Sequence, residues 1–401
     1  MKLRLTLKNS AWSVGSYILT GILALLIRKL FVVYLSDEFL GYEGLFGNLF
    51  AIMAIANLGV DMIISYRLYP AFASKNEEQI CKLMNIYRVI YRMVGSTILI
   101  IGLTIMPLLK FIIRGNTSDW DYIYLVYIIQ LITLLGTYLL AFKRVLFIVD
   151  QKAYECVKLE TIISFLGKLL QIVVIMAFKS YLLYLLLNAV ISLFINVAVA
   201  WKCDRNYHYA SQKMKIGKKE IEKEGLFKDI KDNIVQKIGL TVYGSTDNLI
   251  ISAFLGIGQV ALVSNYMLIS SSVNVLIEKL VTPFQAMVGN IIYSENIEEG
   301  KRLFRLFNYI SFFIATIIAD CFMVLFNPTI QVWLGEKYLL PYAFSVAFAS
   351  NVYVGWCHRF LTFFRNSFGK YDIDKKYILL GTMLNVALSL LLVQPFGVTG
   401  V

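Results

Sequence analysis

The feature that most constrains this sequence is a series of long stretches without a single charged residue. They include residues 9–27, 44–60, 93–109, 122–142, 181–201, 338–357 and 377–401. A helix that crosses the roughly 30 Å hydrocarbon core of a membrane needs about 17–25 mostly apolar residues. A soluble helix would instead place polar residues every few positions along one face. Because charged residues make up 16% of the chain, against about 25% in soluble domains, we predict an all-α integral membrane protein.

The same pattern predicts where the individual spanning helices lie. Eleven are expected, near residues 10–33, 42–65, 91–113, 121–142, 159–178, 181–201, 234–255, 258–282, 306–327, 339–361 and 376–394. With the N-terminus in the cytoplasm, the inner segments hold 31 of the 38 lysines and arginines. Cytoplasmic segments of membrane proteins carry such an excess of cations. The net charge of +12 is therefore explained by orientation in a bacterial inner membrane, and nucleic acid is not an expected partner.

The chain divides at a charged segment, residues 202–233, which is the longest stretch predicted to lie outside the membrane. We expect an N-terminal lobe of six spans in residues 1–201, a basic cytoplasmic linker in 202–233, and a C-terminal lobe in 234–401. The two halves repeat weakly: a Leu-Gly pair opens a span at Leu40 and again at Leu255, and an acidic loop and a basic helix follow each time. Parallel repeats of this kind place a substrate path at the interface between the halves. Since only five spans lie in the second half, a twelfth is expected beyond Val401.

Several short motifs resemble one family of membrane transporters. In the first half they are Gly41-Tyr-Glu-Gly-Leu-Phe-Gly-Asn, Asn57-Leu-Gly-Val, Tyr66-Arg-Leu-Tyr-Pro-Ala-Phe-Ala and Asp150-Gln-Lys-Ala-Tyr. In the second half they are Thr246-Asp-Asn-Leu-Ile-Ile-Ser, Ser264-Asn-Tyr, Trp333-Leu-Gly-Glu-Lys-Tyr-Leu and Gly369-Lys-Tyr-Asp-Ile-Asp-Lys-Lys. In order and spacing they resemble the Wzx-type polysaccharide flippases of the multidrug/oligosaccharidyl-lipid/polysaccharide (MOP) exporter superfamily.

The resemblance implies twelve helices in two six-helix lobes around a central cavity, eleven of them in this chain. It also implies a function: moving undecaprenyl-pyrophosphate-linked oligosaccharide to the outer leaflet for capsule or lipopolysaccharide assembly. A polysaccharide polymerase and glycosyltransferases would be the partners. The drug-exporting branch of the superfamily has a proline in its first helix, and residues 11–34 here contain none.

A flippase of this kind needs cations inside the membrane, because an unpaired diphosphate there costs several kcal/mol or more. Four cations are candidates: Arg28, Lys168, Arg144 and Arg359. Lys168 lies deep in a span, with Gln171 on the same helical face. Arg28 lies near an outer end, and Arg144 and Arg359 lie near inner ends. For these three, interfacial anchoring competes with a role in the cavity.

Two aspartates lie inside predicted spans, Asp247 and Asp320. An ionised carboxylate at that depth needs a cation or a proton as its partner. Asp247 could pair with Lys168 or Arg28, bind a coupling H⁺ or Na⁺, or form a structural pair within one lobe. The same alternatives apply to Asp320.

Two further functions are weaker interpretations. A cation-coupled drug exporter would share the fold and differ mainly in the substrate. A membrane glycosyltransferase or polymerase would need acid–base or metal residues on a sizeable external loop, and the predicted outer loops are short. The pairs Asp119/Asp121 and Asp372/Asp374 are poorly placed for that chemistry, and no P-loop spacing is present. We expect no enzymatic activity and no cofactor.

Overall fold

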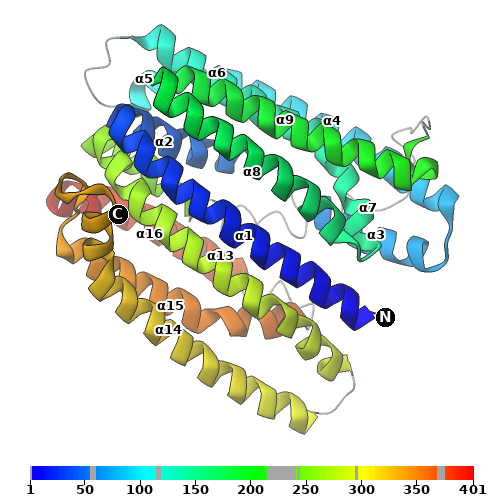
Figure 1. Ribbon diagram of the computed structural model, residues 1–401. Helices are drawn as coiled ribbons and strands as arrows, with labels where there is room; N and C mark the ends of the chain where they lie inside the picture. Colours follow the sequence, from blue (N-terminus) through cyan, green and yellow to red (C-terminus); the bar gives the residue numbers. More distant parts are fainter. Residues whose placement is uncertain are drawn as a thin grey trace. The chain divides into compact units, whose positions relative to one another are not determined.

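A computed structural model describes residues 2–54, 60–113, 119–212, 214, 241, 244–293, 297–367 and 375–401. Every regular element in these ranges is a helix. The chain divides into two compact units, Met1–Leu249 and Ile250–Val401, and Figure 1 shows the helices of each. Of the segments discussed above, most of residues 202–233 and the Asp372/Asp374 pair lie outside the described residues.

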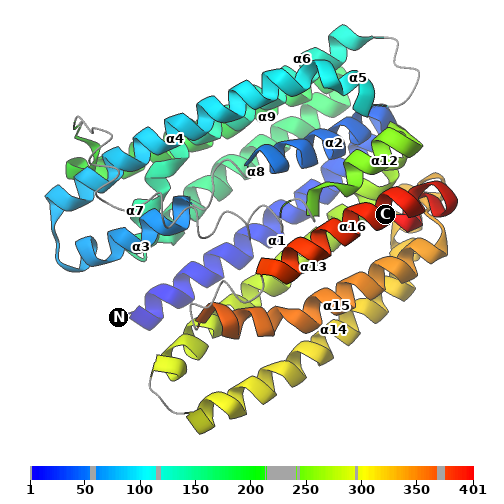
Figure 2. The same cartoon turned by 180° about the vertical axis from the view of Figure 1, so that it is seen from behind.

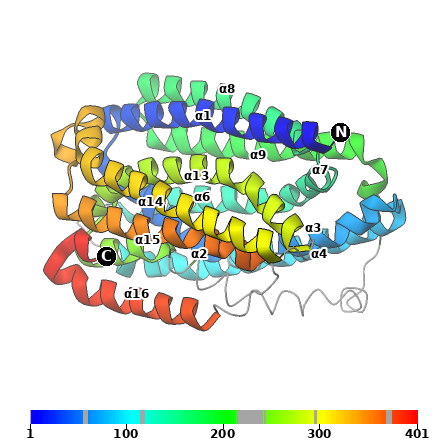
Figure 3. The same cartoon turned by 90° about the horizontal axis from the view of Figure 1, so that it is seen from below.

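The first unit is a bundle of long helices. They are α1 (Lys2–Tyr34), α2 (Asp37–Met53), α3 (Val60–Ala73), α4 (Glu77–Ile105), α6 (Trp120–Leu140), α8 (Ala153–Phe178) and α9 (Tyr181–Asn206), with the short helices α5 (Leu109–Ile112) and α7 (Val145–Val149). Helix α1 packs along α8, α8 along α9, α9 along α6 and α6 along α4. Figure 2 shows α4, α6 and α9 side by side, and Figure 3 shows α1, α8 and α9 running together. The order of contacts makes α9 the centre of the unit.

Aromatic side chains fill the core of the first unit near the turn between α1 and α2. Tyr181, at the start of α9, is 1% exposed. Its ring stacks on Phe39 with centroids 4.5 Å apart and meets Phe31 edge-on at 5.5 Å. Such aromatic pairs contribute about 0.5–1.5 kcal/mol beyond the area they bury. They fix the ends of α1, α2 and α9 against one another.

The second unit contains α13 (Ile257–Tyr293), α14 (Ile297–Leu334), α15 (Tyr342–Ser367) and α16 (Lys375–Phe396); the chain enters it within α12 (Asp247–Leu255). Helices α14 and α15 pack along much of their length. The Tyr266 hydroxyl, fully buried on α13, donates to Asn327 Oδ1 of α14 at 2.8 Å and accepts from the Leu340 amide at 2.9 Å. These bonds join three segments and satisfy a hydroxyl that would be costly to bury alone.

Eight helices of the described chain are long and apolar enough to cross a membrane. They match eight of the eleven predicted spans. The prediction near 42–65 corresponds to α2 and α3, separated by residues outside the description, and α2 alone has 17 residues. The prediction near 339–361 corresponds to α15, whose serines, asparagine and histidine lower its hydropathy. Of the span near 234–255, the structure describes residues 241 and 244–255, which include α12.

Ion pairs tie together the helix ends that the charge pattern places on the inner side. Lys143 Nζ lies 2.5 Å from Asp204 Oδ2, and Lys202 Nζ lies 2.5 Å from Glu155 Oε2. The Tyr207 hydroxyl donates to Asp150 at 2.7 Å, and burial followed by this bond raises the pKa of Tyr207 well above its usual range. These contacts hold the ends of α8 and α9 and the segment before α7 in one arrangement.

A glycine sets the close approach of α8 and α9. A Cβ atom built on Gly167 would collide with the side chain of Ile191. We expect Gly167→Val to lower the thermal unfolding midpoint in detergent, because overpacking of this kind costs about 1–3 kcal/mol. Gly21→Val on α1 is the matched control, since nothing lies within 4 Å of its Cβ position. Equal midpoints for the two variants would show that α8 and α9 do not need this approach.

Candidate functional site

Three cavities of the first unit share wall residues along α9, and we call them together the N-terminal groove. The Glu43 cavity has a volume of about 440 Å³, the Lys168 cavity about 160 Å³ and the Arg144 cavity about 360 Å³. Asn188 lines the first two, Ser192 and Ile195 line the last two, and Thr137 lines the first and the third. Hydroxyls, amides and three charged residues therefore line neighbouring cavities within one unit of the fold.

Arg28 and Glu43 form the first charged pair of the groove region. Arg28 Nη1 of α1 lies 3.5 Å from Glu43 Oε2 of α2, and the side chains are 11% and 27% exposed. Tyr184 of α9 also hydrogen-bonds to the Glu43 carboxylate. Because α1 turns back into α2 at Ser36, which caps α2 by accepting from the Glu38 amide, Arg28 and Glu43 reach the same level of the hairpin.

Lys168 gives this region an unbalanced positive charge. It lies on α8, half-buried, and interacts electrostatically with Glu43. Among the described residues no hydrogen bond or ion pair holds its ammonium group. Lys168 therefore adds a positive charge beside the Arg28–Glu43 pair. The predicted shared face of Lys168 and Gln171 is confirmed, since both line the Lys168 cavity, where Gln171 Nε2 donates to Asn188 Oδ1 at 3.1 Å.

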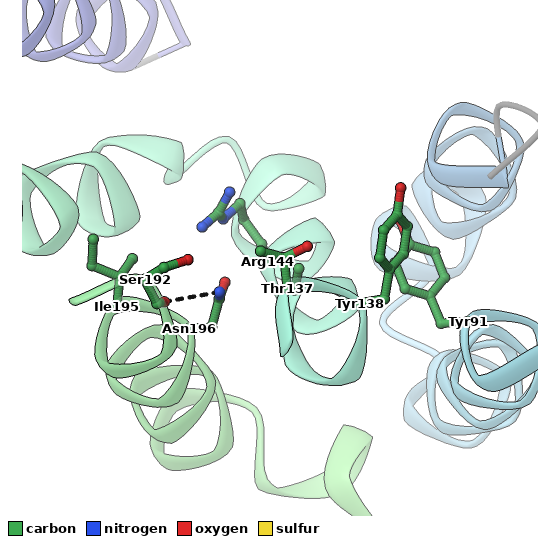
Figure 4. A pocket seen from close by; sticks show the side chains of 8 residues that line it. Tyr91, Thr137, Tyr138, Arg144, Ser192, Ile195 and Asn196 are labelled. Carbon is green, nitrogen blue, oxygen red and sulfur yellow. Dashed lines mark hydrogen bonds between the residues drawn. The ribbon is translucent and has the colours of Figure 1, made fainter. Parts of the chain in front are cut away.

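The Arg144 cavity has a different character. Arg144 Nη2 lies 2.7 Å from Glu160 Oε1, which compensates its charge. Its buried Nε has no hydrogen-bond partner within the described chain. Figure 4 shows Arg144 and Thr137 between the α9 residues Ser192, Ile195 and Asn196 and the tyrosines Tyr91 and Tyr138. The walls are thus two aromatic rings, hydroxyls and one amide around a neutralised guanidinium.

Arg359 lies in the second unit and is held by other contacts. Arg359 Nη2 lies 2.6 Å from Glu278 Oε1, and its guanidinium carbon lies 5.6 Å from the centre of the Trp356 ring. The Trp356 indole in turn donates to Asn274 Oδ1 at 2.7 Å. This network joins α13 and α15 and holds the Arg359 guanidinium against both.

The structure does not form the pair that the sequence suggested between Asp247 and Arg28 or Lys168. Arg28 pairs with Glu43, because the α1–α2 hairpin brings that carboxylate closer along the chain. Asp247 Oδ1 is buried and lacks a hydrogen-bond partner in the described part of the chain. Its neighbour Asn248 donates to the Gly44 carbonyl of α2 at 3.2 Å. The start of α12 therefore rests against α2 beside Glu43.

Asp320 lies on the exposed face of α14. Phe313 and Val324, on the same face, are 61% and 62% exposed. Its helix packs against α13 and α15 through the opposite face, which carries Ala315 and Phe322. Among the described residues of its unit, Asp320 therefore has no partner that would mark a coupling site.

Sequence reasoning missed Glu43, Tyr184 and the tyrosine pair Tyr91 and Tyr138. A signal for Glu43 was present, because Arg28 and Glu43 stand at similar distances from Ser36 along the chain. A tight helical hairpin at Ser36 therefore brings them opposite each other. The tyrosines had no such signal, since 25 tyrosines are spread over the chain and periodicity does not tell which of them meet.

The chain matches no known family model and no curated protein. Solved structures do resemble it. The lipid II flippase MurJ in an inward closed conformation superposes with a TM-score of 0.72 at 12% identity, over 97% of this chain and 83% of that one. An inward-facing multidrug resistance MATE family transporter of the MOP superfamily superposes with a TM-score of 0.68 at 14% identity, over 96% of this chain and 89% of that one. A mutant of the Vibrio cholerae MATE transporter VcmN superposes with a TM-score of 0.65 at 12% identity, over 100% of this chain and 92% of that one. The chain thus has the all-helical fold of MOP-superfamily transporters.

Proposed function

We propose that this protein is a flippase for undecaprenyl-pyrophosphate-linked oligosaccharide repeat units. It moves them from the inner to the outer leaflet of the bacterial cytoplasmic membrane by alternating access, for the assembly of a surface polysaccharide. The observation that carries the proposal is the positive charge that Lys168 adds beside the Arg28–Glu43 ion pair at the N-terminal groove. The resemblance of the sequence motifs to Wzx-type flippases and the fold shared with MurJ support it.

The charge of the groove suits an anionic headgroup. A diphosphate loses its hydration on entering the membrane, and protein cations must replace it. Unit charges 4 Å apart attract by about 4 kcal/mol at an effective dielectric constant of about 20. A guanidinium can also bind two phosphate oxygens at once. The polyprenyl tail can stay in the lipid, so the groove needs to accept only the polar headgroup.

A cation-coupled drug exporter is the second candidate, supported by the MATE transporters of the same fold. The buried carboxylate of Asp247 would favour it, because a carboxylate without a partner inside the membrane is a site for a proton or a cation. Most such drugs are cations, and the residual charge beside Glu43 is positive. The N-terminal groove therefore favours an anionic substrate.

The proposal includes a non-enzymatic role, with a polysaccharide polymerase and glycosyltransferases as partners in the same assembly. A coupling gradient of H⁺ or Na⁺ is compatible with it. A depletion strain tests the function directly. When the protein is depleted, lipid-linked repeat units should accumulate and remain protected from a glycan-cleaving enzyme added to spheroplasts. An unchanged pool of repeat units together with increased sensitivity to ethidium would contradict the proposal and support the drug exporter.

The proposed orientation predicts opposite labelling of two exposed positions. In a background with Cys321→Ala and Cys357→Ala, a cysteine introduced by His208→Cys should react with a membrane-impermeant maleimide only after the cells are opened. A cysteine introduced by Lys337→Cys should react in intact cells. Both native residues are exposed in the structure. Labelling of both positions from the same side would contradict the orientation inferred from the cation count.

A further inference from the structure

The Arg144 cavity differs from the Glu43 cavity in its lining and in its charge. Its volume of about 360 Å³ falls in the range of about 300–1,000 Å³ that is typical of small-molecule sites. Tyr91 and Tyr138 form one wall, with ring centres 5.7 Å apart and planes inclined by 45°. Ser192 and Asn196 of α9 supply a hydroxyl and an amide on the opposite side, and Thr137 supplies a hydroxyl between the two. Aromatic rings combined with convergent hydroxyl and amide groups suit a polar, uncharged ring.

The charge balance of the cavity agrees with an uncharged ligand. Arg144 is the one charged residue in its lining, and Glu160 compensates it at 2.7 Å. Lys168, in contrast, lies beside the Arg28–Glu43 pair and has no ion pair of its own among the described residues. An anionic ligand is therefore attracted to the end of the groove near Glu43 more strongly than to the Arg144 end.

We infer that the Arg144 cavity is a glycan subsite, which binds a sugar ring of the lipid-linked oligosaccharide against Tyr138 and Tyr91 while Arg28 and Lys168 hold its pyrophosphate. This inference rests on the proposed function and deepens it. The C–H face of a sugar packs on the negative face of an aromatic ring, and its hydroxyls bond to Thr137, Ser192 and Asn196. The Arg144 Nε, buried without a hydrogen-bond partner in the described chain, is a further donor for a sugar oxygen.

The two ends of the groove are close enough for one substrate to occupy both. Asn188 lines the Glu43 and Lys168 cavities, and Asn196 lines the Arg144 cavity, on the same helix α9. Eight residues of helix correspond to an axial distance of about 12 Å. In a lipid-linked oligosaccharide the first sugar is bonded directly to the pyrophosphate, so the sugars that follow can reach this far.

Binding measurements on the full chain in nanodiscs test the inference with two probes. One is undecaprenyl pyrophosphate without sugar, and the other is the lipid-linked repeat unit extracted from the producing strain. We expect the wild type to bind the repeat unit about tenfold or more tightly than the bare lipid, since aromatic contacts and hydrogen bonds each supply about 1 kcal/mol. Tyr138→Leu should remove most of this difference and leave the affinity for the bare lipid unchanged.

Three further variants sharpen the test. Tyr138→Phe keeps the ring and should retain most of the preference for the repeat unit. Asn196→Leu should lose part of the preference for the repeat unit over the bare lipid. Tyr309→Leu, at an exposed tyrosine of the second unit, is the matched control and should behave as the wild type. Unchanged binding of the bare lipid by Tyr138→Leu also shows that the variant is folded.

The possible outcomes separate the inference from the proposed function. Equal wild-type affinities for the two probes would overturn the glycan subsite and leave the flippase proposal standing. If Tyr138→Leu weakened both probes equally, the cavity would hold the pyrophosphate instead, and the glycan subsite would again be wrong. If the wild type bound neither probe, the proposed function itself would fail.

Discussion

Surface polysaccharide should be lost from a strain whose only copy of this protein carries Arg28→Ala and Lys168→Ala. The two substitutions remove both cations that face Glu43 in the N-terminal groove and leave that carboxylate without a counterion. The region then repels a diphosphate instead of attracting it. A unit charge attracts a phosphate charge 4 Å away by about 4 kcal/mol at an effective dielectric constant of about 20, which corresponds to a factor of about 10² or more in affinity. Lipid-linked repeat units should accumulate on the cytoplasmic face.

The matched control for this variant is Lys29→Ala with Lys110→Ala. It changes the net charge by the same amount, and both lysines are exposed in the structure. Polymer should remain normal in the control, and immunoblots of membranes should show equal amounts of both proteins. Arg28→Lys should be partly defective, because an ammonium group cannot form the two parallel bonds of a guanidinium to a diphosphate. Normal polymer in the Arg28→Ala, Lys168→Ala strain would refute the charged-groove mechanism.

The helical membrane fold could be predicted because its determinants are local. An uncharged stretch long enough to cross a membrane predicts a helix without any knowledge of its neighbours. The prediction of spanning helices was least accurate where a helix is held in the bundle mainly by packing against its neighbours. Helix α2, with 17 residues, and α15, with several polar residues, are part of the bundle although neither has the length and hydropathy of a spanning helix.

The candidate site could be predicted only in part, because its geometry depends on which helices pack together. Lys168 and Gln171 share a face through helical periodicity alone, and the structure places both at one cavity. The partner of Arg28 depends on the α1–α2 hairpin, which turns Glu43 toward it. The meeting of Tyr91 from α4 with Tyr138 from α6 depends on a contact between helices far apart in sequence. No local pattern encodes such a contact.

Glu43→Gln is expected to have the second largest effect. Unlike the Arg28→Ala, Lys168→Ala variant, it should strengthen the binding of the lipid pyrophosphate. Glutamine keeps the size of the side chain but removes the carboxylate charge, so two cations face the groove without a counterion. Unit charges 4 Å apart at an effective dielectric constant of about 20 interact by about 4 kcal/mol. Since about 1.4 kcal/mol is a factor of ten, affinity for undecaprenyl pyrophosphate should rise at least about tenfold.

Tighter binding at Glu43→Gln should slow transport, because a pathway must bind its substrate strongly enough to admit it and weakly enough to release it. The variant should therefore reduce surface polysaccharide while its purified form retains more bound lipid than the wild type. Tyr184→Phe is the control, since it removes one hydrogen bond to Glu43 and keeps the charge. Its binding and polymer levels should stay near those of the wild type. If Glu43→Gln instead weakened lipid binding, Glu43 would act mainly by holding Arg28 and Lys168 in position, and the excess of positive charge would not be what attracts the substrate.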